Sequence, residues 1–200
     1  MERPASTTHK IAVFSSGLSR GSNLCALHNY FTQNKLPVEV ALVIFTCKNA
    51  PAIPLAKARD LNYQIISANN MQSFEARAIE LCRQNNIELI ALAGFLKQLS
   101  EDFIKQVQVP ILNIHPALLP EFGGKGMYGM AVHQAVFASG DNVSGATIHL
   151  VDSQYDNGKI VAQQKVDISS CKNPAEIAGK VLEIEHSLYA PAIIQFLLKS

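Results

Sequence analysis

Apolar residues in this chain gather in short continuous runs, and the segments between the runs have helical periodicity. Continuous runs of this length predict buried β-strands, because a half-buried strand would alternate and a surface helix would repeat every three to four residues. The sequence predicts strands at 10–16, 38–46, 63–66 and 87–93, and a fifth that ends at Asn113.

The helical segments alternate with these strands. Phe74, Ala78 and Cys82, for example, recur at the spacing of one helix face. Helices are predicted at 24–31, at 52–61, around 74–82, in a short segment ending near Val107, and at 131–138. Strictly alternating strands and helices are typical of a doubly wound, mostly parallel sheet flanked by helices, which is a Rossmann-like α/β fold.

The pattern changes after residue 138. Two strands, 145–151 and 159–166, flank Asp156-Asn157-Gly158, which is strong turn chemistry, so we expect them to pair antiparallel. A long C-terminal helix follows, capped by Asn173-Pro174. We expect a loose tail at 1–9 and a single domain at 10–200, with at most a weak division near residue 113.

Composition limits the classes of function. Hydrophobic residues make up 48% of the chain and charged residues 16%, which indicates a globular protein. The net charge of +1 argues weakly against nucleic acid or an anionic membrane as the main partner. No apolar run reaches the length of a membrane span, no signal peptide is apparent, and the four cysteines form no CxxC pair. We therefore expect a cytoplasmic protein with reduced thiols.

The segment Asn113–Pro120 carries the sharpest candidate chemistry. Pro116 biases His115 toward an extended conformation at the end of a strand, and ligands of open α/β sheets bind at that edge. Asn113 and His115 alternate along the strand and so face the same way. An amide can donate to a developing oxyanion and an imidazole can exchange a proton. A histidine bonded to backbone at the sheet edge is the structural alternative.

A carboxylate follows a later strand. Asp156 near His115 would stabilise the imidazolium and raise the pKa of the histidine. As part of Asp-Asn-Gly, Asp156 is equally well explained as a turn former. His149 lies inside a predicted strand and fits a core histidine. No His/Cys pair has the spacing of a zinc site, so we expect no metal.

Two further candidates are weaker when each is taken alone. Gly21-Ser22-Asn23 places glycine, hydroxyl and amide at a helix N-terminus, which suits a phosphate but also fits an ordinary capped turn. Glu185 lies beside the apolar positions Ile184 and Leu188 of the last helix, where most glutamates are simply solvated.

Taken together, these segments resemble phosphoribosylglycinamide formyltransferase, the folate-dependent enzyme of purine biosynthesis. The most specific motif is LNIHPALLP at 112–120, and SGATIHLVDSQYDNGKIVAQ follows it at 144–163. Gly21-Ser22-Asn23, AGFLKQLS at 93–100 and Glu185-His186 also occur in the family's order. The resemblance covers almost everything from Lys10 to Leu198.

The resemblance implies the roles of individual residues. Asn113, His115 and Asp156 match the family's catalytic residues. Glu185 matches a residue that contacts the ribonucleotide, and Gly21, Ser22 and Asn23 match the segment that holds its phosphate. The folate pocket would be formed by Leu96, Lys97, Gln98, Leu99, Asn113, Val151 and Asp152.

The implied reaction transfers the formyl group of 10-formyltetrahydrofolate to the amine of 5'-phosphoribosylglycinamide. Asn113 and protonated His115 would stabilise the oxyanion, and Asp156 would orient His115. The implied partners are these two small molecules, without metal, and the protein is expected to be a monomer or a homodimer. A formyltetrahydrofolate hydrolase or methionyl-tRNA formyltransferase would be expected to carry an extra domain, and a non-catalytic nucleotide-binding domain would need an accidental His115–Asp156 pairing.

Two segments depart from the family pattern. The first turn is longer through Leu18-Ser19-Arg20, and the loop 122–130 (FGGKGMYGM) is longer than the common form. His133 follows that loop and could replace a family histidine. Phe74, with Arg77 nearby, occupies the place where the family often has a basic residue for the folate tail, so we assign no tail contact.

Overall fold

The computed structural model describes residues 8–17 and 20–198. The chain forms two compact units. The first comprises Met1–Lys97 with Lys105–Pro110, and the second comprises Gln98–Ile104 with Ile111–Ser200. The second unit's main segment begins close to the weak division expected near residue 113, while the assignment of a single domain stays a prediction.

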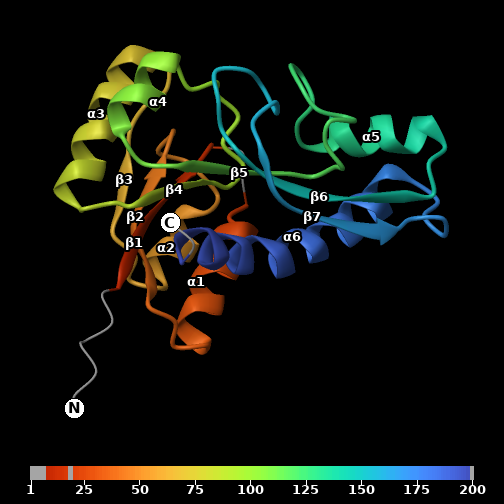
Figure 1. Ribbon diagram of the computed structural model, residues 1–200, viewed down its shortest axis with the longest axis horizontal. Helices are drawn as coiled ribbons and strands as arrows, with labels where there is room; N and C mark the ends of the chain where they lie inside the picture. The colour runs from red at the N-terminus through yellow and green to blue at the C-terminus, as the bar shows by residue number, and fades with distance from the viewer. Residues whose placement is uncertain (1–7, 18–19, 199–200) are drawn as a thin grey trace. The chain divides into compact units, whose positions relative to one another are not determined.

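The first unit contains four parallel strands in the order β3-β2-β1-β4 (Figure 1). The apolar sequences of β1, β2 and β4 are mostly buried, and four consecutive residues of β1, from Ile11 to Phe14, are fully inaccessible to solvent. Full burial explains why the sequence shows continuous apolar runs instead of alternation. The strands are β1 (His9–Ser15), β2 (Val38–Phe45), β3 (Tyr63–Ile65) and β4 (Leu89–Leu92).

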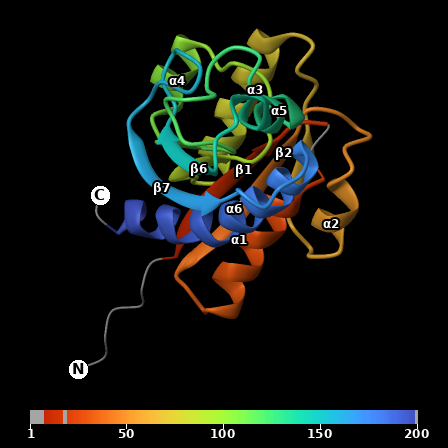
Figure 2. The ribbon, with the colours of Figure 1, turned by 90° about the vertical axis from the view of Figure 1, so that its right-hand side faces the viewer.

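Helices α1 (Ser22–Gln33) and α3 (Met71–Gln84) lie on opposite faces of this sheet (Figures 1 and 2). The Asn70 side chain caps α3 by accepting from the N–H of Ser73. Helix α2 (Ile53–Lys57) is short, and the division between the units passes through α4 (Glu101–Val107). Helices on both faces of a parallel sheet are the doubly wound arrangement expected from the sequence.

The second unit contains three antiparallel strands and the long C-terminal helix. The order is β5-β6-β7, with β5 (Ile111–His115), β6 (Val143–Leu150) and β7 (Ile160–Asp167). Helix α6 (Pro174–Leu197) packs against all three strands and against α5 (Met130–Ser139). Figure 2 shows α6 running beside β7. The core between them consists of small and β-branched residues: Ala117, Val132, Val136, Ala146, Ile168, Ile177 and Val181.

The predicted fold class is confirmed, including the antiparallel C-terminal strand pair and the long helix capped by Asn173. Several boundaries were wrong. The helix expected at 52–61 ends at Lys57, because the chain turns back and Asp60 takes a positive φ of 52°. The fifth strand runs to His115 instead of Asn113. No helix in the described part of the chain is both long enough and apolar enough to cross a membrane.

Candidate functional site

His115 is the last residue of β5, so it is held at the end of a strand as its sequence indicates. Its side chain is only 4% exposed. Nε2 lies 2.8 Å from the carbonyl oxygen of Phe122, and because a carbonyl only accepts, this nitrogen donates. Nδ1 lies 3.5 Å from Oδ2 of Asp156. Both ring nitrogens therefore face oxygen atoms, so one added proton would satisfy both contacts.

Asp156 fills both roles that the sequence left open. Its φ of 53° is the left-handed conformation of a turn residue. The same turn directs its carboxylate toward His115, and Oδ2 also accepts from the N–H of Gly124 at 2.9 Å. A Cβ at Gly123 would lie 2.5 Å from Leu119 Cδ2 and 3.2 Å from Asp156 Cβ, so a side chain there would have to displace Leu119. The absence of a side chain at Gly123 therefore lets the backbone of the loop 122–130 lie close to the Asp156 carboxylate.

The electrostatics of the His115–Asp156 pair differ from the expectation. Burial lowers the pKa of His115, and this outweighs the charge of Asp156 and the carbonyl of Phe122, which raise it. Asp156 therefore raises the pKa of His115 as expected, but the net pKa is still lowered, and the ring is mainly neutral near pH 7. Burial raises the pKa of Asp156, but the neighbouring His149 and His115 rings and the N–H of Gly124 together hold it below its usual range. The carboxylate is therefore ionised.

Asn113 joins the site through His149, the residue directly opposite it on β6. His149 Nδ1 lies 2.9 Å from the carbonyl oxygen of Leu150 and so carries the proton. Nε2 then accepts from the Asn113 amide at 3.0 Å, and it also lies 3.5 Å from Oδ1 of Asp156. Asn113, His149, Asp156 and His115 form one continuous polar cluster inside the second unit.

His149 was not recognised from the sequence as part of this cluster, and His133 was considered only as a replacement for a family histidine. Histidines in strands and helices are common, and only the register of β5 against β6 brings His149 opposite Asn113. His133 lies on α5 and is 7% exposed, and its Nδ1 has no hydrogen-bond partner among the described residues. Burial and the nearby His115 lower the pKa of His133. A neutral His133 therefore adds no positive charge beside His115.

The predicted phosphate segment lies in the first unit. Helix α1 begins at Ser22, two residues earlier than expected, and Gly21 is its N-cap with φ 80°. Only glycine fits there, because a Cβ would lie 2.6 Å from the Cβ of Ala52. The start of a helix favours anions through its N–H groups and dipole. Arg20 is exposed, whereas Leu18 and Ser19 lie outside the described residues.

The predicted folate residues divide between the two units. Leu96 and Lys97 follow β4 in the first unit, and Gln98, Leu99, Val151 and Asp152 belong to the second. Within the second unit, the Gln98 side-chain amide donates to the carbonyl oxygen of Ser153 at 2.8 Å, which joins the two predicted folate segments. Glu185 is buried on α6, with 8% exposure. Ligand contacts of these residues stay predictions.

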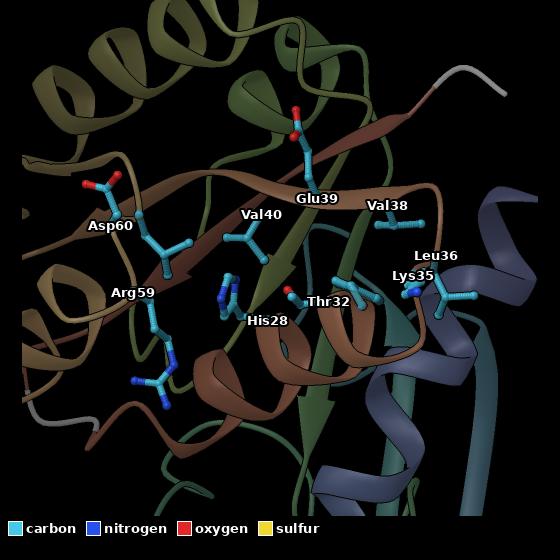
Figure 3. Close-up of a pocket in the computed structure, with 11 residues that line it drawn as sticks. His28, Thr32, Lys35, Leu36, Val38, Glu39, Val40, Arg59 and Asp60 are labelled. Carbon is cyan, nitrogen blue, oxygen red and sulfur yellow. The ribbon is translucent and has the colours of Figure 1, made fainter. Parts of the chain in front are cut away.

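A separate pocket of about 360 Å³ lies in the first unit, between α1, β2 and the segment after α2 (Figure 3). His28 and Thr32 of α1 and Val40 of β2 line it. Burial and the neighbouring Arg59 lower the pKa of His28. The residues that line this pocket include none of those assigned to function from the sequence, so we assign it no part in the site.

Comparison with known proteins identifies the family. Residues 9–193 match the family model described as Formyl transferase. The chain is 35% identical to phosphoribosylglycinamide formyltransferase, chloroplastic, of Arabidopsis thaliana over 188 residues, which is 92% of this chain and 64% of the relative. It is 33% identical to phosphoribosylglycinamide formyltransferase of Bacillus subtilis over 192 residues, which is 94% of each.

Solved structures agree with this result. The crystal structure of phosphoribosylglycinamide formyltransferase from Brucella melitensis matches with a TM-score of 0.85 and 30% identity, covering 95% of this chain and 96% of that one. The chain spans 64% of the Arabidopsis relative and 59% of the relative from Vigna unguiculata. Since the family model covers residues 9–193, this chain belongs to the formyl transferase family.

Proposed function

We propose that this protein transfers the formyl group of 10-formyltetrahydrofolate to the amine of 5'-phosphoribosylglycinamide, a step of purine biosynthesis. The observation that carries the proposal is the buried cluster of the second unit, in which His115 and Asp156 approach to 3.5 Å and His149 links Asp156 to Asn113. Relatives with 31–36% identity over most of this chain have the name of that enzyme.

In this reaction the amine attacks the formyl carbon, and the C–N bond to the folate breaks after a tetrahedral intermediate has formed. The formyl oxygen becomes an oxyanion in between. One N–H of the Asn113 amide is directed at His149, which leaves the second N–H for that oxygen. Loss of one such donor typically costs about 3–4 kcal/mol of barrier. Holding the two substrates together supplies a further large part of the rate enhancement.

The attacking amine must lose a proton, and the leaving folate nitrogen must gain one. His115 is neutral before the reaction because burial lowers its pKa, so its ring can accept a proton as the tetrahedral intermediate forms. Asp156 is ionised and stabilises the imidazolium that results. His115, or a water molecule held by Asp156, would carry the proton from the amine to the folate. No step requires a metal.

Binding of the two substrates is assigned by family resemblance. The phosphate of the ribonucleotide would bind at the start of α1, where the left-handed backbone conformation and the close approach of Ala52 require glycine at position 21. Glu185 would contact the same substrate. The folate would contact Leu96, Lys97, Gln98, Leu99, Asn113, Val151 and Asp152. A cytoplasmic location and a monomeric or homodimeric state stay predictions.

The proposal is tested by incubating purified protein with 10-formyltetrahydrofolate, with and without 5'-phosphoribosylglycinamide, and measuring tetrahydrofolate and formate. We expect tetrahydrofolate to form only with the ribonucleotide, without an equivalent amount of formate. Formate release that is independent of the ribonucleotide would identify a hydrolase. If neither product forms in protein shown to be folded, the chain is not a formyltransferase for this pair of substrates.

A further inference from the structure

Thr147 and Gln163 occupy the same row of the second unit's sheet as His115. Thr147 of β6 lies opposite His115 of β5 on one side and opposite Gln163 of β7 on the other. The Thr147 hydroxyl lies 2.9 Å from Nε2 of Gln163, which donates to it. We refer to these two side chains as the Thr147–Gln163 clamp.

The clamp holds the chain directly after His115. The Thr147 hydroxyl donates to the carbonyl oxygen of Ala117 at 2.6 Å and accepts from the N–H of Leu119 at 3.0 Å. Gln163 Nε2 also donates to the carbonyl oxygen of Leu119 at 3.0 Å. One donor and two acceptor sites are the full capacity of a hydroxyl. Every hydrogen-bonding site of Thr147 Oγ1 is therefore used, and Thr147 is fully buried.

The clamped segment continues into the loop that contacts the proposed catalytic residues. Three residues after Leu119, the carbonyl of Phe122 accepts from His115, and the N–H of Gly124 then donates to Asp156. Leu119 also packs against the position of Gly123. The loop is thus fixed at its base by the clamp, and further along it supplies one hydrogen-bond partner to His115 and one to Asp156.

We propose that Thr147 and Gln163 are positioning residues for formyl transfer: they fix the segment 117–124 so that its backbone orients the His115 ring and the Asp156 carboxylate. This inference rests on the proposed function for its kinetic consequence, and on the hydrogen bonds alone for its structural consequence. Removing the hydroxyl would leave the N–H of Leu119 and the carbonyl of Ala117 buried without their partner, so the segment would shift to pair them elsewhere.

The test compares Thr147→Val, which keeps the shape but removes the hydroxyl, with Thr147→Ser, which keeps the hydroxyl. Gln163→Leu removes the second half of the clamp at a residue that is exposed to solvent. Gln164→Leu is the matched control, because the next residue of a strand faces the opposite side of the sheet. Folding is verified by thermal unfolding and circular dichroism.

Two quantities are measured. In formyl transfer, Thr147→Val and Gln163→Leu should lower kcat by roughly 10- to 100-fold while each KM changes little, because the reacting groups are displaced and not removed. Thr147→Ser and Gln164→Leu should stay near wild type. The second measurement is the ¹⁵N spectrum of the His115 ring in the ligand-free protein, with the signals assigned by comparison with His115→Asn. In wild type, Nε2 carries the proton that is hydrogen-bonded to the carbonyl of Phe122. Both clamp variants should lose the signal of this protonated Nε2.

The spectra are recorded without substrate, so they test the clamp independently of the formyl-transfer assay. The proposed reaction and the proposed clamp can therefore be rejected one without the other. Altered His115 spectra in a protein that catalyses another reaction would support the clamp and reject formyl transfer. If Thr147→Val does not fold, Gln163→Leu decides. Folded Gln163→Leu protein with wild-type kcat and a wild-type His115 spectrum would overturn the clamp, as would equal losses of kcat in Gln163→Leu and Gln164→Leu.

Discussion

Replacing Asp156 with asparagine is the most informative single perturbation of the site. Asparagine keeps the size of the side chain and an oxygen that can accept from Gly124, so the turn should survive. What is lost is the negative charge 3.5 Å from Nδ1 of His115. At an effective dielectric constant of about 20, such a pair attracts by roughly 4–5 kcal/mol.

Only part of this attraction contributes to stabilisation of the transition state. Some solvent reaches Asp156, whose side chain is 11% exposed, and the N–H of Gly124 also stabilises the same carboxylate. About half of the attraction, roughly 2–3 kcal/mol, corresponds to a loss of about 100-fold in kcat. Steady-state formyl transfer at saturating substrates measures this loss. A folded Asp156→Asn protein with kcat within about threefold of wild type would refute the proposed role of the carboxylate.

Three further predictions concern other parts of the chain. Ser22→Ala should raise KM for 5'-phosphoribosylglycinamide more than KM for the folate, and equal effects on both would argue against the phosphate assignment. Burial raises the pKa of the Cys82 thiol to about 12, so this cysteine should resist alkylation at pH 8 until the protein is unfolded, as peptide mass spectrometry would reveal. Burial lowers the pKa of His133 below 6.5, so the unfolded chain binds a proton more readily and stability falls as the pH drops below that value. His133→Leu should therefore reduce the difference in urea stability between pH 7.5 and pH 5.5, and an unchanged difference would contradict the reasoning.

Most of the fold could be predicted because buried parallel strands leave a continuous apolar run in the sequence. β2, for example, was predicted at 38–46 and extends from Val38 to Phe45. The helix caps at Asn70 and Asn173 have a local hydrogen-bond pattern that sequence can indicate. The early end of α2 was missed, because periodicity does not report where Asp60 turns to a positive φ.

The site was predicted in part. The family motif indicated Asn113, His115 and Asp156, and the structure places the three in one cluster. His149 was interpreted as a core histidine, because its contact with Asn113 depends on strand register over 36 residues of separation. Asp156 raises the pKa of His115 as expected, but the net shift of that pKa is downward. The sequence indicates which charge could lie nearby, whereas burial, which dominates here, is set by packing.

Transfer of an isotopically labelled formyl group tests the central claim most directly. Wild-type protein should move the label from 10-formyltetrahydrofolate to 5'-phosphoribosylglycinamide, with one tetrahydrofolate released for each labelled product. His115→Asn, folded and compared at equal concentration, should do so at least ~100-fold more slowly. Recovery of the label as formate, or full transfer by the folded His115→Asn protein, would contradict the account.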